Sequence, residues 1–248
     1  MSLPTDNRSA APLEMLRQAE LGGLHRVQQF LNGSAVEHFR VQRSLASRGV
    51  EGVDDSAKLS PWLAMGALSP RLIFRELRSS AQHSTPPSED PEHRDNDAHS
   101  PASQHTWRAE TLGLENKGGL DWILMHLTIR DFFLFTGLRA GSALFRASGI
   151  RGKEIMWPGT QDNARLWAAG RTGFPFVDAS IRELINTGWT SNRSRQNVAS
   201  FLTKDLQVDW RVGAEFFEML LIDHDVAANY ANWQYVGACH ILYWHFLL

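Results

Sequence analysis

Apolar residues recur along this chain at steps of three and four, the spacing that places them on one face of an α-helix. The stretches with this spacing are residues 12–31, 69–79, 120–138, 177–188 and 197–206. No strand-like alternation of apolar and polar residues stands out, and no internal repeat is visible. Ser60-Pro61 and Ser69-Pro70 indicate helix starts, because serine caps a first turn in which proline is tolerated. The pattern therefore predicts an all-α fold.

A different pattern interrupts the helices between residues 80 and 106. This segment has almost no large apolar side chain and is rich in Ser, Pro, His and acidic residues. It would bury too little apolar surface to offset the entropy lost on ordering, so we expect a disordered insertion. The expected organisation is a flexible N-terminus (1–11), two parts of one helical domain (12–79 and 107–237), the insertion (80–106) and a divergent tail (238–248).

The composition narrows the class of protein. With 43% hydrophobic residues, the chain can bury a core. Its formal net charge of −2 gives no overall basic field, so nucleic-acid binding would depend on a local cluster. The single cysteine, Cys239, excludes an intramolecular disulfide and a cysteine-based zinc site. The N-terminal residues carry no secretory or transit pattern, and no apolar run reaches the roughly 20 residues of a membrane span. We expect a soluble, intracellular protein without a membrane partner.

Polar residues enter the helical pattern at 192–195. In a helix over residues 192–206, Asn192 and Arg195 share one face with an apolar stripe that continues to Leu206. This arrangement places an amide and a guanidinium beside each other at the edge of a core. A solvated first helical turn is the simpler interpretation of these two side chains.

A second polar group follows at Asp223 and Asp225. Two acids beside a short loop are usually helix caps. Asn229 and Trp233, however, continue from Asp225 at four-residue steps, and a helix face of Asp, Asn and Trp resembles neither a core stripe nor a solvated face. Such mixed faces tend to line ligand sites. A planar redox-active heterocycle would use acceptors, an amide and aromatic rings together, although the spacing alone does not name the ligand.

Residues 171–235 closely resemble the flavin-binding core of the photolyase and cryptochrome family. Within it they are nearest to the DASH cryptochromes, whose SNRxRQNVASFLTKDLxxDWRxGAEWFE run is nearly reproduced at 191–218. SAKLSPWLAMGALSPRLIF at 56–74 resembles the family's phosphate-binding turn and the helix after it, and GGLHRVQQFL at 22–31 resembles the preceding helix. The resemblance covers roughly 12–78 and 107–237, and implies an all-helical domain that binds FAD in a bent conformation.

The resemblance also implies the cofactor-binding residues. They are Ser56, Lys58, Leu59 and Ser60 at the phosphates, and Asn192, Arg195, Asp223, Asp225 and Asn229 around the isoalloxazine. In the family's roles, Arg195 pairs with Asp223 beside the ring, Asp225 accepts from ring or ribityl donors, and Asn229 lies near the flavin N5. Backbone N–H groups at a helix start suit phosphates, although an SxxLSP run alone is more simply a cap. Ala57 and Phe39 replace hydroxyl residues of the family, which predicts a weaker hold on FAD.

Three tryptophans occupy the positions of the family's electron-transfer chain from flavin to surface: Trp233, Trp210 and Trp157. The ten-residue step from Trp157 to Trp167 also matches the family. A row of indoles replaces one long electron transfer by several short ones. The alternative is core filling, which we expect for the other six tryptophans.

The substrate side departs from the family. In repair-active members, a helix with Glu and then Trp-Arg lines the hole for a flipped-out pyrimidine dimer, and residues 122–133 correspond to it here. His126 replaces the acid and Ile129 the tryptophan, and loss of one stacking face removes about 1–3 kcal/mol of base recognition. The DNA-binding positions that the resemblance implies are His126, Arg130, Asn192, Arg193 and Tyr235, with Lys204 as a further phosphate contact.

Three functions remain open. The first is a light-dependent photolyase of the DASH type, which would transfer an electron from reduced FAD to pyrimidine dimers in DNA that is single-stranded or has flipped-out bases. The second is a blue-light photoreceptor or nucleic-acid-binding flavoprotein without repair, favoured by the departures on the substrate side. The third is a fragment that binds no flavin, favoured by Ala57 and by the end of the resemblance after Ala238. In each case we expect a monomer.

Overall fold

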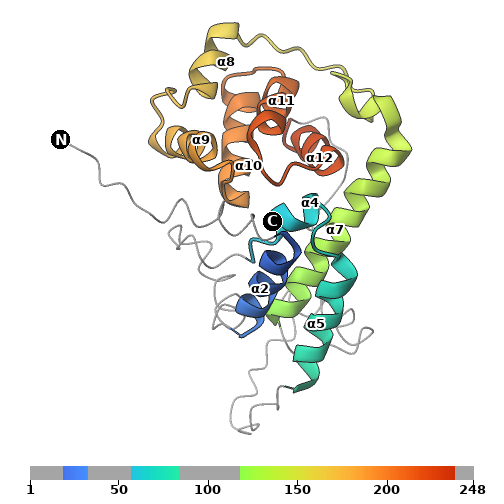
Figure 1. Ribbon diagram of the computed structural model, residues 1–248. Coiled ribbons are helices and arrows are strands. Elements are labelled where there is room, and N and C mark those ends of the chain that lie inside the picture. The colour runs from blue at the N-terminus through green and yellow to red at the C-terminus, as the bar shows by residue number, and fades with distance from the viewer. Residues whose placement is uncertain (1–18, 33–56, 84–117, 238–248) are drawn as a thin grey trace, which may run out of the picture. The chain divides into compact units, whose positions relative to one another are not determined.

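The computed structural model describes residues 19–32, 57–83 and 118–237 of the chain (Figure 1). All regular secondary structure in these ranges is helical, which confirms the all-α prediction. The described residues divide into two compact units. The larger unit holds residues 60–65 and 129–237, and the smaller unit holds the remainder.

The smaller unit contains α2 (Ala19–Asn32) and α5 (Pro70–His83), which pack against each other. Each helix presents an apolar stripe with buried residues, including Val27 and Phe30 on α2 and Ile73 on α5. These are positions of the three-and-four spacing in the sequence, so burial of the apolar face explains why both segments are helical.

Helix α5 begins where the sequence predicts and ends later. The Ser69 carbonyl accepts hydrogen bonds from the N–H groups of Leu72 and Ile73, so the helix starts at the Ser-Pro pair. It continues to His83, and the expectation of a disordered insertion is therefore wrong for residues 80–83. These four residues contain no proline, so nothing in them breaks a helix that has already formed. The rest of the insertion, the N-terminal segment 1–11 and the tail 238–248 lie outside the described residues.

The larger unit is built around the helices from residue 161 onward. In chain order it contains α4 (Ser60–Ala64), the end of α7 (Gly118–Ala140), η4 (Gly141–Phe145), α8 (Gln161–Ala168), α9 (Pro175–Thr187), α10 (Asn192–Ser200), η5 (Phe201–Asp205), α11 (Trp210–Leu220) and α12 (Val226–Val236). Helix α10 contacts α9 and α12, and α12 packs along α11 (Figure 1). Fully buried side chains at the centre include Trp167, Ile181, Leu184 and Leu202.

Local signals fix the ends of these helices. The residues whose side chains accept from first-turn N–H groups are Thr160 (α8), Ser191 (α10), Asp209 (α11) and Asp225 (α12). Helix α9 instead has Pro175 at its first position and ends at Gly188 in the left-handed conformation. Helix α10 continues through the π-helical turn η5, which agrees with the helix expected over 192–206.

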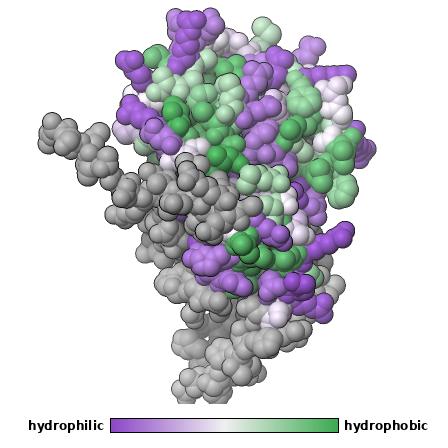
Figure 2. All heavy atoms as spheres, viewed as in Figure 1, coloured by the Kyte–Doolittle hydropathy of each residue, from purple (hydrophilic) through white to green (hydrophobic). Residues whose placement is uncertain are grey.

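The surface mixes apolar and polar residues (Figure 2). The exposed apolar side chains include Phe135 and Leu138 on α7 and Met219 on α11. Among the described helices, none is both long enough and apolar enough to cross a bilayer.

Candidate functional site

A buried ion pair joins α10 to the loop between α11 and α12. The Arg195 guanidinium donates to Oδ2 of Asp223 at 2.8 Å, and the Asp223 side chain is 2% exposed. The pairing that the resemblance implied is therefore present. A carboxylate this deeply buried needs a fixed cation, because an isolated buried charge is strongly unfavourable.

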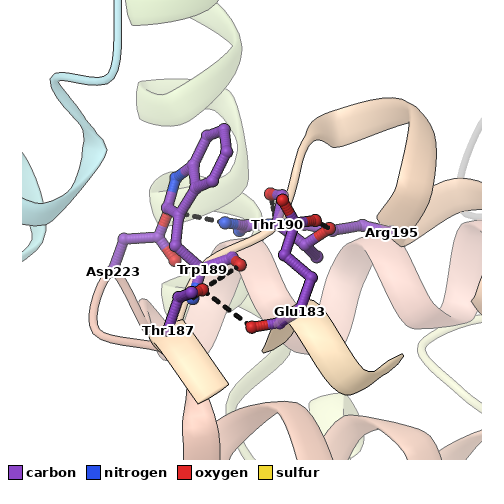
Figure 3. A network of polar contacts seen from close by, with 6 residues as sticks. All are labelled: Glu183, Thr187, Trp189, Thr190, Arg195 and Asp223. Atoms are coloured by element: carbon purple, nitrogen blue, oxygen red, sulfur yellow. Dashed lines mark hydrogen bonds and ion pairs between the residues drawn. The ribbon is translucent and has the colours of Figure 1, made fainter. Parts of the chain in front are cut away.

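Backbone and side-chain contacts from α9 hold this pair in position (Figure 3). Nε of Arg195 donates to the Thr190 carbonyl at 3.0 Å, and the Thr190 hydroxyl donates to the Glu183 carboxylate. The loop that carries Asp223 is fixed separately, because the Ile222 N–H donates to the Gly188 carbonyl at 3.0 Å. The sequence interpretation missed Glu183 and Thr190, of which Thr190 contacts Arg195 directly and Glu183 contacts Thr190.

Gly188 allows this close approach. Its φ of +69° lies in the region that favours glycine, and a Cβ there would lie 2.7 Å from Cγ2 of Ile222. A larger residue at Gly188 would therefore displace the loop that carries Asp223.

The second oxygen of Asp223 has no partner among the described residues. Oδ1 is buried and accepts no hydrogen bond from any residue in the part of the chain that the structure describes. An unsatisfied buried acceptor costs about 1–3 kcal/mol, and a ligand N–H group would satisfy it. This oxygen is therefore the clearest sign of a ligand site at these residues.

Asp225 and Asn229 lie one turn apart at the start of α12. The Asp225 carboxylate accepts from the Ala228 N–H at 2.8 Å, so the capping interpretation is correct for one of its oxygens. The Asn229 amide donates to the Ala214 carbonyl at 2.9 Å and ties α12 to α11, which leaves its own side-chain oxygen as an acceptor. Asn192 is exposed at the first position of α10, one turn before Arg195.

Trp233 and Trp210 are buried in the interface between α11 and α12. Gly213 on α11 touches the indole of Trp233, since a Cβ there would lie 2.1 Å from its Cη2. Gly237, just after α12, is close to Trp210 in the same way, since a Cβ at Gly237 would lie 3.0 Å from Cβ of Trp210. Gly213 on α11 therefore lies beside the tryptophan of α12, and Gly237 at the end of α12 lies beside the tryptophan of α11.

Trp157 lies in the segment between η4 and α8, half-buried against the core. The Gly159 N–H donates to the Gln207 carbonyl at 3.0 Å, so this segment pairs with the loop that leads into Trp210. The indole N–H of Trp157 is buried and has no acceptor among the described residues. Trp167, in contrast, is fully buried and donates to the Val198 carbonyl, which agrees with the core-filling role expected for it.

Residues 122–246 match the family profile described as the FAD binding domain of DNA photolyase. The chain belongs to this family. The cofactor of the domain is FAD. The match runs past residue 238, where the resemblance was expected to stop.

This FAD-binding domain has cryptochromes among its relatives. It is 41% identical to Cryptochrome DASH of Danio rerio over 231 residues, which are 93% of this chain and 37% of that protein. Cryptochrome DASH of Xenopus laevis is 39% identical to it, over 93% of this chain and 37% of that protein. The crystal structure of a Synechocystis cryptochrome matches with a TM-score of 0.71 and 38% identity, over 89% of this chain and 39% of that one. The chain thus spans about two fifths of the length of these relatives, since it covers 37% of the Xenopus laevis protein and 39% of the Synechocystis chain.

The positions at which the resemblance implies phosphate contacts lie at the start of α4. Lys58 has a φ of +47°, a conformation that is unusual outside glycine and is often retained at ligand-binding turns. Leu59 is buried, and Ser60 is the first residue of α4. Ser56 and Phe39 lie outside the described residues.

The positions expected to contact DNA differ in their surroundings. His126 is exposed on α7. Arg130 is half-buried, with NH1 3.6 Å from the Asp131 carboxylate and NH2 3.5 Å from the Leu63 carbonyl. Ile129 packs against the core of the larger unit. The other candidates are Arg193 and Lys204, both exposed, and Tyr235, which is half-buried on α12.

His224, between the two aspartates, is a half-buried residue that the sequence interpretation did not single out. Neither imidazole nitrogen has a hydrogen-bond partner among the described residues, although Nε2 lies 3.8 Å from the Glu218 carboxylate. That carboxylate also accepts from the Tyr230 hydroxyl at 2.8 Å. Burial, together with this acceptor, raises the pKa of Tyr230, so the phenol stays neutral.

Proposed function

We propose that this domain binds FAD beside the Arg195–Asp223 pair and carries out light-driven electron transfer, with pyrimidine dimers in single-stranded DNA as the acceptor. The observation that supports it best is the shared interface of α11 and α12. This interface buries Trp210 and Trp233, and the same α12 helix carries Asn229 one turn before Trp233. Polar groups suited to a flavin and indoles suited to electron transfer therefore adjoin one another.

The protein residues position the cofactor and set its electrostatic surroundings. FAD, when bound, supplies the absorption of light and the exchange of electrons. Arg195 provides a positive charge that favours added electron density on the ring, and Asp223 accepts a hydrogen bond from a ring N–H through its unpartnered oxygen. Asn229 would place its amide beside a bound flavin ring, and Lys58, Leu59 and Ser60, together with Ser56, would contact its phosphates.

Trp157, Trp210 and Trp233 carry electrons inward from the surface, and each is oxidised by its neighbour on the flavin side. The substitution Trp233→Phe tests this role, because a phenyl ring fills most of the space and is much harder to oxidise than an indole. We expect FAD to remain bound, while photoreduction by an external donor falls to near the dark rate. Trp62→Phe, which alters a buried tryptophan of α4, is the matched control and should leave photoreduction unchanged. Equal photoreduction in both variants would remove the electron-transfer role.

The visible spectrum of the purified chain tests cofactor binding itself. A flavin spectrum after purification or after addition of FAD supports the proposal. A colourless protein that takes up no FAD would instead favour a fragment without flavin.

A second candidate function is a blue-light photoreceptor that does not repair DNA. It is favoured by His126 and Ile129, which replace the acid and the stacking tryptophan of repair-active members. Illumination of the FAD-loaded chain with dimer-containing DNA separates the two candidates. Loss of dimers from single-stranded DNA supports repair through contacts from Arg130, Arg193 and Tyr235. Light-dependent change in the flavin without any loss of dimers supports the photoreceptor.

A further inference from the structure

A pocket of about 1010 Å³ lies in the larger unit, between η4 and the segment that leads to α8. Its walls include Phe145, Arg146, Ala147, Ile155, Met156 and Arg211. None of these residues belongs to the FAD or DNA positions described above. The volume is at the upper end of the range for small-molecule sites and would hold a molecule as large as a dinucleotide.

The walls of the pocket adjoin two of the three tryptophans. Met156 directly precedes Trp157, and Arg211 directly follows Trp210. The indole N–H of Trp210 donates to the carbonyl of Ala147, a wall residue, at 3.2 Å. A molecule in the pocket would therefore lie beside the outer part of the tryptophan chain.

The chemistry of the walls favours a flat organic anion. Arg146 is exposed and forms no ion pair with any acid in the described ranges. Arg211 is held rigid by Asp209, whose carboxylate lies 2.6 Å from its NH2. The hydrogen bond that Arg211 donates to Asp209 raises the pKa of Arg211 more than burial lowers it, so its charge is retained. Only one acid, Glu154, lies in the wall.

The apolar part of the wall is exposed to solvent. Phe145 is 46% exposed and Met156 is 90% exposed. A conjugated ring would cover the phenyl and thioether groups, while its acidic substituent would lie near Arg146. Exposed apolar side chains beside an unpaired cation thus define the class of ligand.

We propose that this pocket binds a small conjugated organic anion that reduces Trp157. The inference rests on the proposed electron-transfer function. After Trp157 has given up one electron toward Trp210, the bound donor transfers one electron to the oxidised indole and restores it. The donor is thereby oxidised by one electron and releases a proton to water. Reduced nicotinamide dinucleotide (NADH) has this chemistry and serves as the probe.

Photoreduction of the FAD-loaded chain at increasing NADH concentration tests the proposal. We expect the rate to saturate with NADH and to rise linearly with dithiothreitol, which is neutral and has no ring. Arg146→Glu should raise the half-saturating NADH concentration about tenfold, because attraction becomes repulsion, and should leave the dithiothreitol rate unchanged. Arg146→Lys should restore saturation. The control is Arg151→Glu, which alters an exposed arginine outside the pocket wall and should behave as the unmodified protein.

A calorimetric titration with NADH in the dark separates this proposal from the proposed function. NADH binding that is weakened by Arg146→Glu and unchanged by Arg151→Glu would support the pocket. This support would stand even if Trp233→Phe left photoreduction unchanged, because that result contradicts only the electron-transfer role. A linear dependence on NADH, or equal effects of Arg146→Glu and Arg151→Glu on binding and rate, would overturn the pocket proposal. Circular dichroism of each variant checks the fold, and these exposed substitutions should not disturb it.

Discussion

The contact between Gly213 and Trp233 predicts the effect of a single methyl group. An ideal Cβ at Gly213 would lie 2.1, 2.4 and 2.7 Å from Cη2, Cζ3 and Cζ2 of Trp233. Trp233 is 2% exposed, so its ring has no free space into which it could move. Overpacking of this kind costs about 1–3 kcal/mol, and alanine recovers about 1 kcal/mol through its helix propensity. Because 2.1 Å is a severe overlap, we expect Gly213→Ala to destabilise the domain by about 1–2 kcal/mol net.

Urea unfolding followed by circular dichroism measures this loss, and the Trp233→Phe background supplies the control. A phenyl ring has fewer atoms at the far end where the overlap occurs, so Gly213→Ala should be nearly neutral or stabilising by up to about 1 kcal/mol in that background. The displaced indole should also slow photoreduction in Gly213→Ala. An increase in stability in the unmodified background would refute the reasoning, since it would mean that the two groups are not in contact.

Two further predictions concern charges. Arg195→Ala leaves the Asp223 carboxylate buried without a cation and should lower the unfolding free energy by about 3 kcal/mol in urea titrations; a loss below that of an exposed-pair control, Arg165→Ala, would contradict it. Burial raises the pKa of Asp178, but its carboxylate accepts hydrogen bonds from the Thr172 hydroxyl and N–H and from the Gly173 N–H. Together these hydrogen bonds outweigh burial and lower the pKa. The contribution of Asp178 to the free energy of unfolding is therefore present above the usual carboxyl pKa and is lost as the pH falls through the lowered pKa. Asp178→Asn should reduce Tm by roughly 2 °C at pH 7, and the difference should shrink well below pH 4.

Much of the helical framework follows from local signals in the sequence. The apolar spacing and the Ser-Pro pair predicted α5, and the apolar stripe that runs to Leu206 predicted α10 and its continuation. The end of α5 was missed because residues 80–83 have a composition that permits a helix without demanding one. Local composition therefore located the helices better than it located their ends.

The site depended on contacts that local patterns do not encode. Arg195 and Asp223 are 28 residues apart, and only the family resemblance linked them. The contact of Glu183 with Thr190 depends on how the chain turns between α9 and α10, and no sequence pattern used above predicts it. Asp225 was ambiguous because one carboxylate can cap a helix with one oxygen and keep the other for a ligand. The structure shows the capping oxygen of Asp225, and the flavin experiments test whether the other oxygen binds a ligand.

The unpartnered oxygen of Asp223 links cofactor supply to the lifetime of the protein. Without a ligand, the folded chain carries an acceptor that water would satisfy in the unfolded state, so unfolding regains that hydration. A ligand that donates to this oxygen removes the imbalance and adds its own binding free energy to folding. We therefore expect newly made chains to be degraded faster in cells starved of riboflavin, with the flavin pool setting how much folded protein accumulates.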